Sequence, residues 1–232
     1  MSRAGAVLAA IALVLGAAVA TWHDGRWRLP ERHDPWAPLS IEEPPGWTTR
    51  WKLARLSDDP QACRAALAPL PWRVAALPER RGADGCELVD ALRIDAMRVR
   101  VGRPFALSCP AAVSLAMWET HVLWPAAERH LGRRPVAIEH YGSYACRDVR
   151  GAAGLRSRHA SANALDLAAV VLDDGRRVTV ARDWHGDGAA AAFLRELHRG
   201  ACRWFDVVLG PEHDAAHADH LHVDRGPRRA CR

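Results

Sequence analysis

The pattern of hydrophobic and polar residues between positions 59 and 132 predicts helices with one extended segment between them. Residues 59–68 are typical of a short helix, which the following proline stops. Apolar positions alternate through residues 92–101, which indicates a strand pair or one bent strand. Ser108 is placed to cap a helix that opens with a proline and runs to about residue 123. We expect Pro125 to break this helix before a second helical stretch that ends at Gly132.

The second half of the pattern predicts strands separated by one long helix. The turn signal Asp173-Asp174-Gly175 lies between two apolar runs, residues 165–172 and 177–181, and indicates a hairpin. The remaining expected elements are strands at 136–141, 204–209 and 219–224 and a helix at 187–199 with Gly200 at its end. Hairpin strands with separate helices favour an α+β fold with a mainly antiparallel sheet and flanking helices.

The N-terminal segment predicts export. Residues 4–20 are apolar and uncharged, which is short for a span of about 20 residues. We therefore expect residues 1–20 to be a signal peptide or an N-terminal membrane anchor. Small residues at 18–20 suit cleavage, whereas Trp22 and Trp27 with Arg26 and Arg28 would hold an uncleaved segment at the membrane interface. The expected location is the periplasm, either free or anchored to the inner membrane.

Residues 21–58 are expected to link this segment to a domain at residues 59–232. Prolines at 30, 35, 38, 44 and 45 are spaced too closely for a helix or a central strand, so we predict a semi-rigid linker. Its tryptophans can bind glycan or lie at the membrane surface, but we favour the simpler interpretation that several pack on the domain. These tryptophans are Trp22, Trp27, Trp36, Trp47 and Trp51.

Composition limits the class of protein. A chain of 232 residues that is 49% hydrophobic can bury one good core. The net charge is +5, but the basic residues are almost all dispersed arginines interleaved with 27 acids, and Lys52 is the only lysine. No basic helix or aromatic-basic platform is evident, so we exclude nucleic acid as a partner. A mildly cationic surface suits an anionic polymer such as a bacterial wall.

Six cysteines in an exported chain favour disulfides over thiolate metal ligands, and none forms a CxxC pair. Proximity in the sequence suggests the pairs Cys63–Cys86, Cys109–Cys146 and Cys202–Cys231. The chain segment closed by the Cys202–Cys231 pair includes the histidines at 217–222, so reduction of this disulfide is expected to loosen that region.

Two histidine-rich segments suggest a zinc site. Ser157-Arg-His159 is followed by Asp166, and the C-terminal segment reads His217-Ala-Asp-His220-Leu-His222. A catalytic zinc ion takes three nitrogen or oxygen ligands from the protein and leaves a fourth position to water. His159, Asp166 and one of His220 or His222 supply three. The order and separation of these residues predict a Zn²⁺-dependent hydrolase.

The same residues resemble a known superfamily. The pattern Ser157-x-His159-x-x-x-x-Ala164-x-Asp166, followed by the HxxHxH segment at 217–222, resembles the metallopeptidases that include D-alanyl-D-alanine carboxypeptidases, murein endopeptidases, lysostaphin-type peptidases and the hedgehog domain. More closely, residues 60–232 resemble the bacterial extensin-like C-terminal domain family, through segments 142–147, 201–205 and 208–211 as well. Ala162 is a departure, because the superfamily usually has glycine there, and a positive φ would strain alanine.

The resemblance implies a hedgehog/D-Ala-D-Ala-peptidase-like fold and roles for individual residues. It implies that His159, Asp166 and His222 bind zinc, and that His217 and His220 flank the reacting water and carbonyl. A histidine of near-neutral pKa can take a proton from water and pass it to the leaving amine. Which of His217 and His220 is the general base stays open, and Asp219 ranks lower because a regular strand would point it away.

Three further residues are candidates for substrate contacts. By resemblance, Arg147 would hold a peptide carboxylate or the oxyanion, although a surface ion pair is the alternative interpretation. Tyr144 would hydrogen-bond the same intermediate. Ser157 is expected to orient the ligand loop rather than to attack, because no Gly-x-Ser-x-Gly elbow presents it. The other histidines are expected to be packed or surface side chains (His121, His130, His140, His185 and His198), and His213 is undecided.

These observations predict a zinc-dependent peptidase or amidase that acts on the peptides of peptidoglycan. One alternative is a noncatalytic, zinc-stabilised envelope-binding module, which Ala162 and the tryptophan-rich linker would favour. Another is a zinc hydrolase with a substrate outside the wall. The bond that is cut and the oligomeric state stay open.

Overall fold

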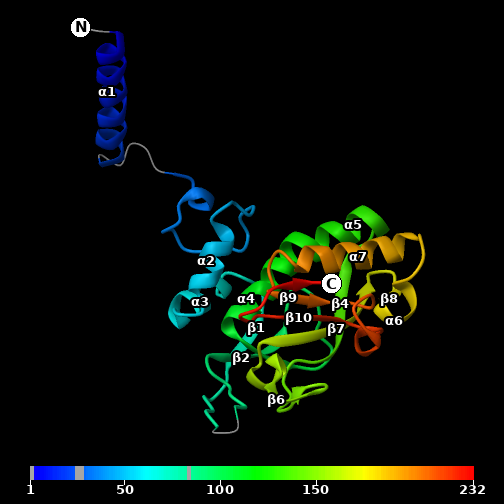
Figure 1. Ribbon diagram of the computed structural model, residues 1–232. Coiled ribbons are helices and arrows are strands. Elements are labelled where there is room, and N and C mark those ends of the chain that lie inside the picture. The colour runs from blue at the N-terminus through cyan, green and yellow to red at the C-terminus, as the bar shows by residue number, and fades with distance from the viewer. Residues whose placement is uncertain (1–2, 24–28, 83–84) are drawn as a thin grey trace.

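The computed structural model describes residues 3–23, 29–82 and 85–232 (Figure 1). Helix α1 (Arg3–His23) has the length and composition of a membrane span at residues 3–21, and none of that window is buried against the rest of the described chain. A signal sequence has the same properties, so the helix fits either form of export. The interface residues expected at Arg26, Trp27 and Arg28, and the side chain of Trp22, lie outside the described residues.

The segment expected to be a linker is largely part of the domain. Helix α2 (Thr49–Arg55) follows the single turn η1 (Glu31–His33), and Leu39, Ile41 and Leu53 are buried in the common core. The buried Lys52 ammonium donates hydrogen bonds to the carbonyls of Glu31 and Pro38, at 2.7 and 3.3 Å. The prolines exclude regular structure here, as expected, but the apolar residues between them still bury themselves on the domain.

The tryptophans of this segment differ from the favoured interpretation. Trp36 and Trp47 are each 75% exposed and Trp51 is 42% exposed. The rings of Trp36 and Trp51 meet edge to face, with centroids 5.4 Å apart, and the Arg55 guanidinium lies over both. Aliphatic side chains, not the aromatic ones, attach this segment to the core.

Three antiparallel strands and a long helical segment follow. Helix α3 (Pro60–Leu67) is confirmed, and the strand order is β1-β2-β3, with bounds Arg73–Ala76, Ala91–Ala96 and Phe105–Ser108. Ser108 caps α4 (Cys109–Trp118) as predicted. The break expected at Pro125 is absent: a π-helical turn, η2 (Glu119–Leu123), leads into α5 (Trp124–Leu131), which ends at left-handed Gly132. Because the π turn resets the hydrogen-bond register, the missing N–H of Pro125 falls in the first turn of α5.

The principal sheet carries the candidate site. Within the described residues its strand order is β11-β9-β10-β7-β4, and β8 also pairs with β7. Only the β9–β11 pair is parallel, so the predicted mainly antiparallel α+β class is confirmed, including the β7–β8 hairpin. The strands are β4 (Pro135–Gly142), β7 (Ala164–Leu172), β8 (Arg177–Thr179), β9 (Val207–Leu209), β10 (Leu221–Asp224) and β11 (Ala230–Cys231).

Helices cover one face of this sheet. Helix α7 (Ala189–Ala201) lies beside α5 (Figure 1), and α6 (Val180–Asp183) follows β8. Alternate residues of β7 and β10, such as Leu167 and Leu221, are buried in the same core as Leu197 of α7. Gly200 lies inside the last turn of α7 rather than beyond it, where the side chain of Val122 fills the space a Cβ would need. The residues between the buried ones therefore project from the opposite face of the sheet.

The cysteine pairing corrects two of the three predicted disulfides. Cys202–Cys231 is confirmed, but the other pairs are Cys63–Cys109 and Cys86–Cys146. Pairing cysteines by their proximity in the sequence is wrong here, because strands β1–β3 lie between α3 and α4 in the chain. These strands bring the start of α4 back beside α3.

The Cys86–Cys146 disulfide lies next to the candidate site. Its two loops hydrogen-bond the turn η3 (Arg158–Ser161): the Glu87 N–H donates to Ala160 and the Ala145 N–H donates to His159. A two-stranded ribbon, β5 (Asp148–Val149) with β6 (Ala152–Arg156), separates Cys146 from η3. The Cys86–Cys146 disulfide thus joins the two loops that hold η3 in place by hydrogen bonds.

Ala162 ends this turn in the left-handed region, at φ +52° and ψ +29°, with no exposed surface. The strain expected for alanine at this position is therefore present, at about 1–2 kcal/mol. Replacing Ala162 by Gly relieves it but removes a buried methyl group and adds chain entropy, so we expect a net change in unfolding free energy within about 1 kcal/mol. Ala160→Gly, at an equally buried position without positive φ, should destabilise by about 1–2 kcal/mol. Urea unfolding of both variants tests this, and an equal loss in the two would contradict it.

Candidate metal centre

Strand pairing brings the first two candidate ligands together. In the β7–β10 register Asp166 lies directly opposite His222, and the flanking Leu165 and Val223 are buried in the core. Because side chains alternate along a strand, Asp166 and His222 share the face away from the helices. Their closest atoms, Asp166 Oδ1 and His222 Nδ1, are 2.9 Å apart.

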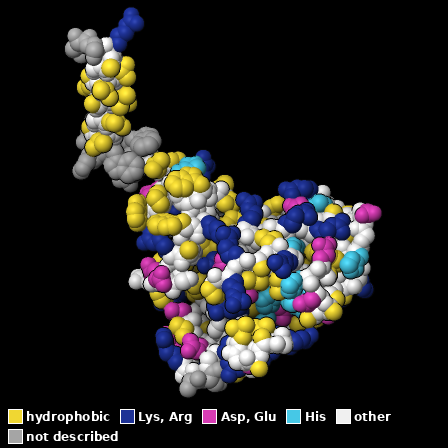
Figure 2. All heavy atoms as spheres, viewed as in Figure 1, with side chains coloured by type: hydrophobic (Ala, Val, Ile, Leu, Met, Phe, Trp, Pro, Cys, Tyr) yellow, Lys and Arg dark blue, Asp and Glu magenta, His cyan; other side chains and the backbone are white. Residues whose placement is uncertain are grey.

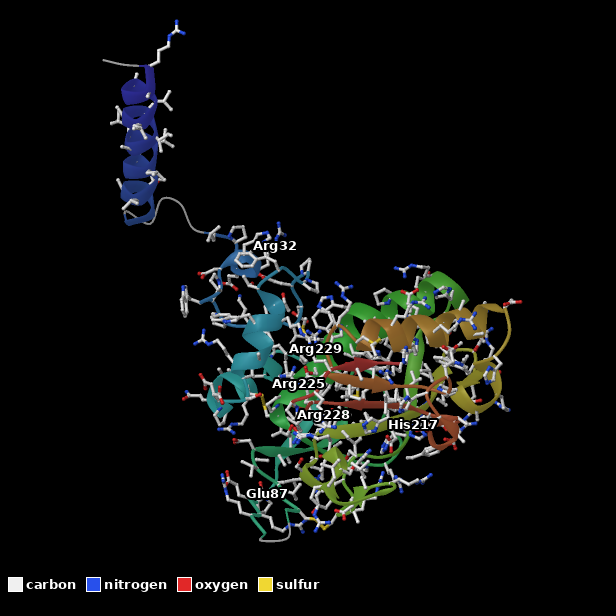
Figure 3. All side chains as sticks on the ribbon, viewed as in Figure 1. Arg32, Glu87, His217, Arg225, Arg228 and Arg229 are labelled. Atoms are coloured by element: carbon white, nitrogen blue, oxygen red, sulfur yellow. A yellow bond between two sulfur atoms is a disulfide. The ribbon has the colours of Figure 1, made fainter. Side chains whose placement is uncertain are left out.

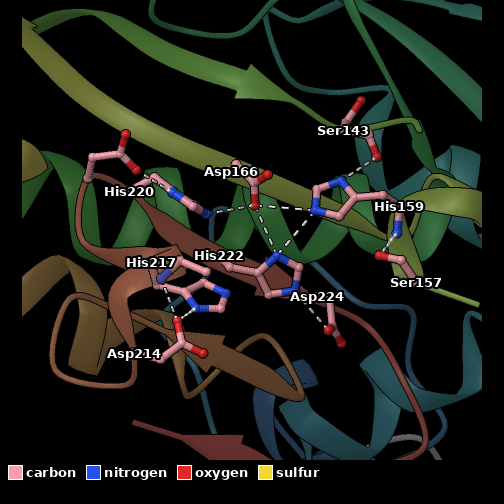
Figure 4. Close-up of polar contacts among 11 residues, drawn as sticks. Ser143, Ser157, His159, Asp166, Asp214, His217, His220, His222 and Asp224 are labelled. Carbon is pink, nitrogen blue, oxygen red and sulfur yellow. Dashed lines mark hydrogen bonds and ion pairs between the residues drawn. The ribbon is translucent and has the colours of Figure 1, made fainter. Parts of the chain in front are cut away.

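His159 completes a group of three donors. It lies in η3, the turn that precedes β7, and only 3% of its surface is exposed. Its Nε2 atom is 3.2 Å from Asp166 Oδ1 and 3.2 Å from His222 Nδ1 (Figure 4). Tetrahedral zinc with bonds of about 2.0–2.1 Å needs ligand atoms about 3.3 Å apart. Two imidazole nitrogens and one carboxylate oxygen at 2.9–3.2 Å therefore fit one face of a zinc coordination sphere.

Hydrogen bonds behind the histidines fix which nitrogen faces the centre. His159 Nδ1 is 3.1 Å from the Ser143 carbonyl oxygen, which only accepts, so this nitrogen carries the proton and Nε2 presents its lone pair. His222 Nε2 is 3.1 Å from Asp224 Oδ2, and donation there leaves the lone pair of Nδ1 for the centre. Metal-binding histidines in proteins are held by outer hydrogen bonds of this kind.

The carboxylates also set the charge of the three donors. Burial would lower the pKa of His222, but hydrogen bonds to the carboxylates of Asp166 and Asp224 outweigh it and raise the pKa to about 9. Burial would raise the pKa of Asp166, but the neighbouring His159 and His222 rings hold it well below its ordinary value. The centre thus contains a carboxylate that is ionised at neutral pH and a histidine that holds a proton until a cation replaces it.

Asp224 is expected to strengthen metal binding, although it is not a ligand. Asp224→Asn replaces the carboxylate that holds His222 Nε2–H and should lower zinc affinity about 10–100-fold. The measurement is a competition titration against a chromogenic chelator. Asp206→Asn, which changes a carboxylate that bonds the arginines Arg50 and Arg225 instead, is the matched control and should bind zinc as the wild type does. Unchanged affinity in Asp224→Asn would contradict the assignment.

Two more histidines lie beside the centre. His220 Nε2 is 3.5 Å from Asp166 Oδ1, and its Nδ1 is 2.9 Å from Asp219 Oδ1. The His217 ring is 5.3 Å from that of His220, centroid to centroid, and His217 Nδ1 is 2.7 Å from Asp214 Oδ1. Burial lowers the pKa of His217, partly opposed by the Asp214 hydrogen bond. A neutral His217 whose Nδ1–H is donated to Asp214 keeps Nε2 free to accept a proton.

One comparison decides the family. The family model for the extensin-like protein C-terminus matches residues 61–232. This chain belongs to the extensin-like C-terminal family. Comparisons with curated proteins and with solved structures find no match. The matched region of this extensin-like protein includes all three candidate ligands and the histidines beside them, whereas α1 and the tryptophan-rich segment precede it.

The extensin-like domain does not bring every predicted site residue to the centre. Ser157 does cap η3, and its Oγ accepts the His159 N–H at 3.3 Å, which fits an orienting role. Arg147 is exposed, and among the described residues its side-chain hydrogen bond goes to the neighbouring Asp148 carbonyl at 3.4 Å. The Tyr144 ring contacts the Arg80 guanidinium, and its buried hydroxyl has no hydrogen-bond partner within the described part of the chain. Within the described residues, no hydrogen bond or ion pair joins Arg147 or Tyr144 to the three donors.

Several residues of the centre were not recognised from the sequence. Asp224 could have been found, because it lies two residues after His222 in a strand and so shares its face. Asp214 gave a weaker signal, since it precedes the histidine that it contacts. Asp219 was considered only as a lower-ranked base, and the structure places it before β10, where it contacts His220 Nδ1. Ser143 acts through its backbone carbonyl, which no side-chain pattern reveals.

One cleft in the described residues lies apart from the metal centre. It has a volume of about 360 Å³ and is lined by Arg158, Asn163 and Arg225 among others, but by none of the three donors. The three donors are instead largely buried, with side chains 4%, 15% and 13% exposed for His159, Asp166 and His222. Other histidine side chains reach the surface on the face that Figure 2 shows.

Proposed function

We propose that this extensin-like domain is a zinc-dependent peptidase or amidase that hydrolyses peptide bonds of bacterial peptidoglycan, and that it belongs to the D-Ala-D-Ala carboxypeptidase, murein endopeptidase, lysostaphin and hedgehog superfamily. The observation that carries the proposal is the tetrahedral spacing of His159, Asp166 and His222 with two further histidines alongside. Zinc bound there would polarise a scissile carbonyl and lower the pKa of water.

The protein's own residues supply the proton transfers. His217 is neutral near pH 7 because burial lowers its pKa, so its Nε2 can take a proton from the attacking water and deliver it to the leaving amine. Asp214 keeps the ring oriented through the 2.7 Å contact to Nδ1. His220 is held by Asp219 beside Asp166, and because its Nδ1–H is donated to Asp219, its Nε2 would donate a hydrogen bond to the developing oxyanion only in the imidazolium form. These assignments make His217 the general base.

Location and substrate are proposed on separate grounds. Three disulfides fit an oxidising compartment, and α1 fits export, so we place the domain in the periplasm, free or anchored to the inner membrane. The net charge of +5 suits the anionic wall.

A wall-digestion experiment tests this function. Disulfide-intact protein lacking α1, loaded with one equivalent of zinc, is incubated with purified sacculi, and soluble muropeptides are identified by mass spectrometry. We expect released or shortened peptides whose new termini identify the bond that is cut, and at least about 10²-fold slower release with His217→Ala. Co-sedimentation without any released product would contradict the hydrolase and support the alternative below.

The second candidate is a noncatalytic, zinc-stabilised module that binds the envelope. The exposure of Trp36 and Trp47 favours it, because exposed indole rings are suited to stacking on sugars. Arg147 also lies away from the donors, so the expected clamp for a substrate carboxylate is not assembled. In the sacculus experiment this candidate predicts binding that Trp36→Ala with Trp47→Ala weakens.

A further inference from the structure

A second group of metal-binding side chains lies on the turn that leads into β10. His213, Asp214 and His217 surround the single turn η4 (Ala215–His217), and one donor atom from each lies within 4.8 Å of the other two. His213 Nε2 is 3.6 Å from Asp214 Oδ2, and His217 Nδ1 is 2.7 Å from Asp214 Oδ1. Figure 3 places His217 on this loop beside the sheet. The set of two imidazoles and a carboxylate repeats the chemistry of the first centre.

The second group is open to solvent, unlike the first. The side chains of His213, Asp214 and His217 are 29%, 48% and 17% exposed, whereas that of His159 is 4% exposed. A cation can therefore reach this group without passing the first centre. The three donor atoms lie within 4.8 Å of one another, whereas a tetrahedral zinc ion needs ligand atoms about 3.3 Å apart. The side chains must therefore rotate inward to bind the ion. A binding site of this kind is weaker than a preformed one.

We infer that His213, Asp214 and His217 form a second, weaker zinc site, and that its occupation inactivates the hydrolase by taking His217. The binding stands on the geometry of the three side chains, and the inactivation rests on the proposed function. The two sites are neighbours, because the His217 ring lies 5.9 Å from that of His222, centroid to centroid.

The inactivation follows from the tautomer of His217. Without a second ion, Nδ1–H is donated to Asp214 and Nε2 is the acceptor. Zinc bound at Nδ1 moves the single ring proton of the neutral imidazole to Nε2, so no proton is gained or lost by the ring. That nitrogen then only donates, and His217 can no longer accept a proton from water. Excess zinc is thus expected to inhibit while the first zinc ion stays bound.

His213 belongs to the second site but not to the first, so its variants test the second site alone. In the described structure no hydrogen bond, ion pair or ring contact joins its side chain to the three donors or to His220. Its side chain contacts Asp214 and the His217 ring, and its N–H donates to the Gly210 carbonyl. His213→Ala removes one ligand of the second site and leaves the Asp214–His217 pair in place. His213→Gln is the companion variant that keeps the size and polarity of the side chain.

The test is zinc stoichiometry by equilibrium dialysis at pH 7.5 over increasing free zinc, followed by sacculus digestion at each concentration. We expect two sites in the wild type and one in both His213 variants. We also expect equal digestion at one equivalent of zinc, with inhibition by excess zinc shifted at least about tenfold upward in the variants. One site in the wild type, or two in the variants, would overturn the inference. The stoichiometry is decided even if no digestion occurs, so failure of the hydrolase and failure of the second site give different results.

Discussion

Replacing His217 by Ala is expected to lower the rate of peptide-bond hydrolysis about 10²–10⁴-fold, the usual effect of losing a general acid-base group. The cause is loss of the ring that takes and returns the proton, since His217 Nε2 is free and burial holds its pKa low. Zinc content should stay at the wild-type value at one equivalent, because His217 does not contact the three donors by a ligand atom. The measurement is initial-rate release of muropeptides, with zinc determined on the same sample.

The matched control for this variant is His213→Ala, which changes the preceding histidine of the same turn and should digest sacculi normally at one equivalent of zinc. A second control is the pH profile. At pH values where zinc content is confirmed to stay at one per chain, the rate should fall in the wild type as acidification protonates His217, and the residual rate of His217→Ala should lack that limb. A His217→Ala protein with wild-type turnover would remove His217 from the mechanism and leave His220 as the base.

Zinc affinity at the first centre is expected to rise about tenfold for each pH unit up to about pH 9. The pKa of His222 is raised to about 9, because its hydrogen bonds to the carboxylates of Asp166 and Asp224 outweigh burial. Below that pH, zinc must displace the proton from His222, and each unit of acidification makes the proton a tenfold better competitor. Chelator competition at pH 6.5, 7.5 and 8.5 measures the slope. An affinity that is constant over this range would show that His222 is already neutral.

The same raised pKa has a consequence for the metal-free domain. A histidine whose pKa is higher in the folded than in the unfolded state stabilises the fold fully below the unfolded value, near 6.5, and this contribution disappears as pH rises toward 9. The metal-free protein should therefore lose unfolding free energy across this window, and zinc should restore it. Asp224→Asn, which removes one of the two carboxylates that raise the pKa, should flatten both profiles.

The sequence allowed the centre to be located better than the fold around it. His159, Asp166 and His222 were grouped from spacing and resemblance, and the pairing of the distant strands β7 and β10 then places Asp166 opposite His222 on one face of the sheet. The β7–β8 hairpin followed from the turn at Asp173-Asp174-Gly175, because its two strands are adjacent in the chain. Local rules suffice where the interacting residues are close in the chain or share one periodic element.

Features that depend on tertiary packing were not accessible from local patterns. The pairing of Cys63 with Cys109 depends on how α4 returns to α3, and burial of Leu39 and Ile41 depends on a surface that other elements create. Arg147 was placed at the site by resemblance, but the loop carries it outward. The π turn before Pro125 also depends on context, since the helix can continue only by shifting its hydrogen bonds.

Zinc content per chain is the measurement that tests the central assignment most directly. Disulfide-intact protein lacking α1 is equilibrated at pH 7.5 with a free zinc concentration buffered below the range of the weaker second site, and metal is determined by mass spectrometry. About one zinc per chain in the wild type and in His130→Ala, a histidine that pairs with Glu196 away from the centre, is the predicted result, with almost none in His159→Ala and His222→Ala. Zinc retained by both ligand variants, or absent from a folded wild-type protein, would contradict the account.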